Sequence, residues 1–142
     1  MERSKQKYIS FIPALIWAGI IVFMSLLPSN KLPVDVLVVS DKIIHASIYF
    51  VLTLFLIVAF IYISNDVTNS IIKRKFIIAV LISLLFGILI EVAQEMMNIG
   101  RSGDWKDVIA NLFGTVIVYP FTKIMQNSDI FKKIISRKIG KN

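Results

Sequence analysis

Residues Glu91–Gly114 read EVAQEMMNIGRSGDWKDVIANLFG, and this polar stretch between two apolar segments decides how the chain folds. Four of the nine acidic residues of the chain lie in it: Glu91, Glu95, Asp104 and Asp107. The segment before it, residues 76–90, has fifteen residues without a charge. That length covers about 22 Å as a helix, less than the roughly 30 Å of a bilayer core. A helix that crosses a membrane here must therefore continue through Glu91, Gln94 and Glu95.

The composition supports a membrane protein. The chain has 142 residues, enough for one compact unit, and its 56% hydrophobic content and mean hydropathy of +0.76 exceed the usual range of soluble domains. It contains no cysteine, which excludes disulfides, thiolate chemistry and cysteine-based metal sites. The net charge is +7. In a chain this hydrophobic, basic residues typically set the membrane topology or contact anionic lipid. We expect no nucleic-acid binding, because no binding module is recognisable.

The sequence predicts an all-α membrane protein with one domain over residues 1–142 and four transmembrane helices. Their expected ranges are about 8–27, 43–63, 76–97 and 107–125, followed by a basic amphipathic tail at 128–142. Residues 8–27 carry no charge, and no small-residue cleavage site follows them, which favours an uncleaved helix over a signal peptide. The tail fits a helix on the anionic inner leaflet or a frayed charged end, and both interpretations stay open.

The basic residues predict the orientation. Twelve of the sixteen lysines and arginines fall at the amino terminus, at Lys73–Lys75 or from Lys123 onward, and four fall in the two other connections. The positive-inside rule then places both termini in the cytoplasm. Most of the acidic residues collect at the opposite, extracytoplasmic end.

Three polar stripes are expected to meet at that end, because residues three or four apart share a helix face. The second predicted helix begins with Asp41, His45 and Tyr49, the third ends with Glu91, Gln94 and Glu95, and the fourth begins with Asp107, Asn111 and Gly114. Ionisable groups inside a membrane span cost about 2.5–3.5 kcal/mol each on insertion scales. We therefore expect them to face one another around a polar pocket between these three helices.

The candidate residues fall into two groups. The catalytic candidates are Asp41, His45, Glu91 and Asp107, with His45 as general acid or base oriented by Asp41. The substrate-binding candidates are Tyr49, Gln94, Arg101, Asp104 and Asn111, with Arg101 suited to an anionic head group.

Each candidate also has a purely structural interpretation. The aspartates can cap helices, His45 can be a packed and hydrogen-bonded side chain, and Gln94 and Asn111 can bond one helix to another. A metal held by His45, Glu91 and Asp107 would have a weak ligand set of one histidine with carboxylates. No cofactor is expected, and metal use is left open.

The ordered motifs resemble the VanZ-like family. They are Ser25-Leu-Leu-Pro28, Asp41-Lys-x-x-His45-x-x-x-Tyr49, Glu91-x-x-Gln94 and Arg101-x-x-Asp104-x-x-Asp107-x-x-x-Asn111-x-x-Gly114. The resemblance spans all four predicted helices. It implies a small integral protein of the bacterial cytoplasmic membrane, in a family whose namesake is associated with teicoplanin resistance. It marks these positions as signature residues without assigning their roles.

Four functions follow from these observations. The first is an enzyme acting on a lipid-linked or cell-envelope substrate through activated water or a substrate hydroxyl, since no strong nucleophile is present. The second is a non-enzymatic accessory protein that binds an envelope precursor, a glycopeptide or a partner. The third is a proton-coupled carrier, and the fourth is a purely structural use of the polar groups. Membrane lipid is the expected partner, and the oligomeric state is left open.

Overall fold

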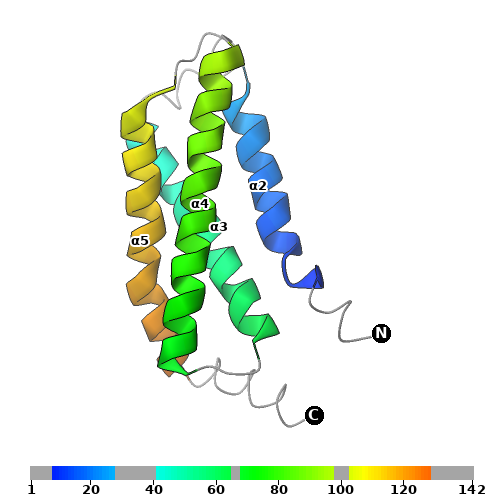
Figure 1. Cartoon of the computed structure of the whole chain (residues 1–142), viewed down its shortest axis with the longest axis vertical. Helices are drawn as coiled ribbons and strands as arrows, with labels where there is room; N and C mark the ends of the chain where they lie inside the picture. The colour runs from blue at the N-terminus through cyan, green and yellow to red at the C-terminus, as the bar shows by residue number, and fades with distance from the viewer. Residues whose placement is uncertain (1–7, 28–40, 65–67, 98–102, 129–142) are drawn as a thin grey trace.

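The computed structural model describes residues 8–27, 41–64, 68–97 and 103–128, which form an antiparallel bundle (Figure 1). Its helices are α2 (Ile12–Ser25), α3 (Asp41–Ile63), α4 (Asn69–Met97) and α5 (Trp105–Asn127). Consecutive helices run in opposite directions, so α2 and α4 end where α3 and α5 begin. The predicted all-helical fold is confirmed for the described residues.

Three of these helices, α3, α4 and α5, are long and apolar enough to cross a membrane. Their outward surfaces agree with this, because large apolar side chains such as Leu81, Leu85 and Phe113 are exposed. An exposed apolar surface of this extent marks contact with lipid or with other proteins. Helix α2 is apolar but has only 14 residues, about 21 Å of helix.

The helix bounds differ from the predicted ones at two places. Helix α4 begins at Asn69, so Lys73–Lys75 belong to the helix and not to a loop. The charged turn stays helical because Ile72 is buried and the Lys75 ammonium lies 5.7 Å from the centroid of the Phe60 ring. Helix α2 covers fewer residues than the predicted 8–27. The predicted tail lies outside the described residues from position 129 onward.

Helix α3 lies at the centre of the bundle and contacts each of the other three helices. Its contact with α2 includes a hydrogen bond from Nε1 of Trp17 to the carbonyl of Ile48 at 2.9 Å. Its contact with α4 includes a buried hydrogen bond from Thr53 to Ser83 at 2.9 Å. These bonds satisfy polar groups that would otherwise be unpaired in an apolar interior.

Helices α3 and α5 cross with their backbones in close contact. A Cβ added at Gly114 would lie 2.0 Å from the carbonyl oxygen of Ala46. Small residues at a membrane-helix interface permit such an approach. This crossing sets the rotation of α5 against α3 and so the direction in which their polar side chains point.

Candidate functional site

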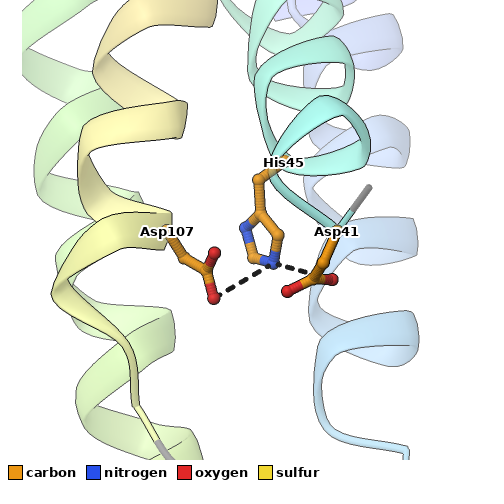
Figure 2. A group of neighbouring side chains, drawn as sticks. All are labelled: Asp41, His45 and Asp107. Atoms are coloured by element: carbon orange, nitrogen blue, oxygen red, sulfur yellow. Dashed lines mark ion pairs between the residues drawn. The ribbon is translucent and has the colours of Figure 1, made fainter. Parts of the chain in front are cut away.

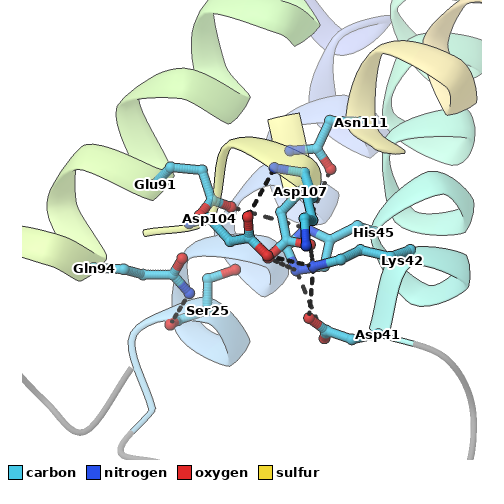
Figure 3. Close-up of polar contacts among 10 residues, drawn as sticks. Ser25, Asp41, Lys42, His45, Glu91, Gln94, Asp104, Asp107 and Asn111 are labelled. Atoms are coloured by element: carbon cyan, nitrogen blue, oxygen red, sulfur yellow. Dashed lines mark hydrogen bonds and ion pairs between the residues drawn. The ribbon is translucent and has the colours of Figure 1, made fainter. Parts of the chain in front are cut away.

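Polar side chains from three helices gather at one end of the bundle (Figure 3). They come from the first turns of α3 and α5 and from the last turns of α4, which the antiparallel arrangement brings to the same end. We call this group the polar cluster; its members are Asp41, Lys42, His45, Glu91, Asp104, Asp107 and Asn111. The cluster contains all four residues that the sequence proposed as catalytic.

His45 lies at the centre of the polar cluster and is 6% exposed. Its Nδ1 is 3.2 Å from Oδ1 of Asn111, and because an amide oxygen only accepts, Nδ1 is the donor. The other ring nitrogen, Nε2, lies 3.7 Å from Oδ2 of Asp107 and 3.8 Å from Oδ1 of Asp41 (Figure 2). The predicted proximity of Asp41 and His45 is present, and Asp107 from α5 joins them.

Lys42 is the cluster residue that the sequence analysis did not single out. Its ammonium donates to Oδ2 of Asp104 at 2.9 Å and to Oδ1 of Asp107, and it lies 3.7 Å from Oδ2 of Asp41. The sequence analysis counted Lys42 among the charges of a connection and included it in the motif that begins at Asp41, but gave it no role in the site. The sequence did contain a signal for it, because Lys42 lies in the first turn of α3, at the end of the bundle where most carboxylates collect.

Glu91 approaches His45 from the α4 side. The residue is 6% exposed, and its Oε2 accepts a hydrogen bond from the backbone amide of Asp104 at 3.0 Å. Its Oε1 lies 4.0 Å from Nδ1 of His45 and has no hydrogen-bond partner among the described residues. An unpaired buried carboxylate oxygen is costly, so its retention beside a histidine needs a reason.

Asp104 begins helix α5 and pairs with Lys42. Its side chain accepts a hydrogen bond from the backbone amide of Lys106 at 2.9 Å, which makes Asp104 the N-cap of α5. The hydrogen bond from Lys42, together with that from the Lys106 amide, lowers the pKa of Asp104 below its ordinary value. Asp104 is therefore charged at neutral pH.

The other predicted binding residues occupy different positions. Gln94 donates to the carbonyl oxygen of Ser25 at 2.8 Å, so it joins α4 to the end of α2 and serves packing. Tyr49 is 1% exposed and lies deeper in the bundle. Its hydroxyl and Nδ2 of Asn111 have no hydrogen-bond partner among the described residues. Arg101 lies outside the described residues.

An apolar groove runs along α3 and α5 from the polar cluster. Its volume is about 650 Å³. Its lining residues include Lys42 and Lys106 at the cluster end, the small residues Ala46 and Gly114, and Phe50 and Phe113. Lys106 forms no ion pair within the part of the chain that the structure describes. The groove therefore has apolar walls and two lysine side chains at its cluster end.

This arrangement is suited to acid–base chemistry and to binding a polar group. A buried histidine whose two nitrogens face an amide and two carboxylates can hold a proton at a defined atom. Among the described residues, the side chains grouped closely enough to ligate a metal ion are Asp41, His45 and Asp107, so Asp41 takes the place that the sequence analysis gave to Glu91. Comparison of the chain with protein-family models, with curated proteins and with solved structures finds no match in any of the three.

Proposed function

We propose that this protein is a multi-pass protein of the bacterial cytoplasmic membrane that acts on a lipid-linked or cell-envelope substrate. In this proposal all four helices cross the membrane, both termini are cytoplasmic, and the polar cluster forms a pocket open to the extracytoplasmic side. The motif resemblance to VanZ-like proteins extends the proposal to a contribution to glycopeptide resistance, teicoplanin resistance in particular.

The observation that carries this proposal is the position of His45. A histidine that is hydrogen-bonded to Asn111 through one nitrogen, with two aspartates 3.7 and 3.8 Å from the other, is a candidate general acid–base group with a defined orientation. Glu91 is the second candidate acid–base group, because its buried Oε1 faces the same ring without a partner among the described residues. Positioned acid–base catalysis typically contributes about 10²–10⁴-fold to a rate.

The groove along α3 and α5 supports a lipid-linked substrate. It offers apolar walls for a hydrocarbon chain and ends at Lys42 and Lys106, whose ammonium groups suit a phosphate. A substrate with its chain in the groove would have its head group beside His45.

A binding protein without chemistry is the second candidate function. It is favoured by the three buried polar atoms of the cluster region that lack a partner within the described residues, on Tyr49, Glu91 and Asn111. Such atoms suit hydrogen bonds to a polar ligand, and none of them requires a reaction.

Two substitutions, Glu91→Gln and His45→Gln, test the proposal. We expect both variants to reach wild-type levels in the membrane and to lose the teicoplanin tolerance that the wild-type chain confers on a susceptible bacterium. Glu95→Gln is the matched control, because Glu95 is exposed and bonds only the backbone amide of Gly103 among the described residues. Full tolerance in both cluster variants would contradict the proposal, and loss of both proteins from the membrane would assign the cluster to folding.

The lipid-linked envelope precursors of cells with and without the protein separate the two functions. An enzyme changes the mass of a precursor, and His45→Gln abolishes that change. A binding protein alters drug binding to the cells while the precursors stay identical.

A further inference from the structure

We propose that Asp41, His45 and Asp107 form a binding site for one divalent transition-metal ion, with zinc as the reference ion. This inference goes beyond the proposed function and does not depend on it, since metal binding can be measured without a substrate. The three residues come from the first turns of α3 and α5, and one side-chain atom of each lies within 4.8 Å of the others.

The distances fit a metal site that closes slightly on binding. Nε2 of His45 lies 3.8 Å from Oδ1 of Asp41 and 3.7 Å from Oδ2 of Asp107. Zinc bonds of about 2.0–2.1 Å place two ligand atoms of a tetrahedron roughly 3.4 Å apart. Movements of a few tenths of an ångström bring each aspartate oxygen to that distance from Nε2, and the ligand atoms of all three residues lie within 4.8 Å of one another before any movement.

The hydrogen bond of His45 to Asn111 uses Nδ1 and leaves Nε2 facing the two aspartates. Because Nδ1 donates to Oδ1 of Asn111, the lone pair of the neutral ring is on Nε2, which faces the two aspartates. Nε2 has no hydrogen bond to any described residue. Metal-binding histidines commonly donate their other N–H to an oxygen acceptor, and Asn111 has that role here.

Lys42 does not occupy the proposed position. It contacts Oδ1 of Asp107 and Oδ2 of Asp41, which are the other oxygens of the same carboxylates. Oδ2 of Asp107 and Oδ1 of Asp41 remain directed at His45 (Figure 2). The ammonium thus orients both carboxylates in the way that groups around a metal site orient its ligands.

Glu91 places a further buried carboxylate beside His45. Its buried Oε1 has no hydrogen-bond partner among the described residues and lies 4.0 Å from Nδ1 of His45. A metal ion on Nε2 would increase the positive character of Nδ1–H and so stabilise this carboxylate. Three carboxylates of the cluster, on Asp41, Asp104 and Asp107, lie near the Lys42 ammonium, and Glu91 adds a fourth beside His45, so the carboxylates outnumber the ammonium.

The donor set indicates the class of metal. One imidazole nitrogen with two carboxylates is a weaker ligand set than several histidines, but the imidazole favours zinc or manganese over magnesium and calcium, which prefer oxygen ligands alone. Three protein ligands leave one tetrahedral position open, as catalytic zinc sites do.

Metal content and affinity of the full chain, purified in detergent and stripped of metal, test the inference. We expect one zinc per chain, a higher Tm with zinc, and visible absorption of tetrahedral cobalt when Co²⁺ is added to the wild-type protein. Affinity for zinc falls at least tenfold in His45→Gln, Asp107→Asn and Asp41→Asn. Glu95→Gln keeps wild-type affinity and controls for loss of an acidic group at the same end of the bundle. Magnesium does not compete.

Several results would overturn the inference. They are the absence of stoichiometric zinc, zinc affinity unchanged in Asp41→Asn, or an equal loss in Glu95→Gln, which would indicate surface binding. The side chain of Asp41 is 53% exposed, so this variant keeps the test valid if His45→Gln or Asp107→Asn fails to fold. The cobalt spectrum of the wild-type protein requires no variant, and an octahedral spectrum would also contradict the site.

Discussion

At the scale of single residues, Lys42 links α3 to α5 through ion pairs. It pairs with Asp104 and Asp107 across the α3–α5 contact, while Asp107 itself is 6% exposed. Removing one partner of a buried charged pair leaves the other charge without compensation, which costs more than the pair contributes. The lysine is therefore a stabilising residue as well as a member of the candidate site.

The substitution Lys42→Met tests this role. Because Asp107 would lose a charged hydrogen-bond donor, we expect the free energy of unfolding to fall by about 1.5–3 kcal/mol. Thermal unfolding in detergent measures the change. Lys106→Met is the matched control, since Lys106 forms no ion pair in the described part of the chain, and its effect should stay within about 0.5 kcal/mol. Equal effects of the two substitutions would contradict a special role of Lys42.

At the scale of elements, the crossing of α3 and α5 decides which side chains meet. The spacing of Asp41 and His45, and that of Asp107 and Asn111, follows from one helix turn and was readable in the sequence. Their contact with each other depends on the close approach at Gly114. A shift of either helix would separate His45 from Asn111, which are now 3.2 Å apart.

Gly114→Ala is expected to separate the two helices. The added Cβ would meet the backbone of Ala46 at 2.0 Å, and a backbone cannot rotate away as a side chain can. Overpacking of this kind typically costs about 1–3 kcal/mol, which a lower Tm measures. Gly19→Ala in α2 is the control, because a Cβ there meets nothing within 4 Å and the better helix former gains about 0.5–1 kcal/mol. A wild-type Tm for Gly114→Ala would show that the crossing adapts.

At the scale of the whole molecule, the bundle has a polar end and an opposite end that carries the basic turn of α4. The antiparallel order of the helices puts the start of α3 and of α5 together with the end of α4 (Figure 1). The proposed orientation directs the polar end away from the cytoplasm, because Lys73–Lys75 and the residues from Lys123 onward carry most of the positive charge.

Single cysteines test the orientation, since the chain has none of its own. Ser102→Cys precedes α5 and Ser128→Cys follows it, so the two report opposite ends of the same helix. We expect an impermeant thiol reagent added to intact cells to label Ser102→Cys and to label Ser128→Cys only after the membrane is opened. The reverse pattern would contradict the proposed topology, and labelling of both in intact cells would contradict a membrane-spanning α5.

The sequence by itself determined the helical class, the three membrane-length helices α3, α4 and α5, and the polar stripes on individual helices. These properties are local, because hydrophobic length and a period of 3.6 residues are visible along one segment. The predicted start at residue 76 differs from the observed start of α4 at Asn69. The helix continues through the charged residues, which lie beside the buried Ile72 and the ring of Phe60.

Only the tertiary structure decided how the stripes face one another. It placed Lys42 among the aspartates, used Gln94 to hold α2, and grouped Asp41 with His45 and Asp107 as potential metal ligands. These contacts join residues far apart in the chain, and they depend on the rotation of α5 against α3 at the Gly114 crossing. A helical period sets which residues share a face, whereas the packing of two backbones sets what that face meets.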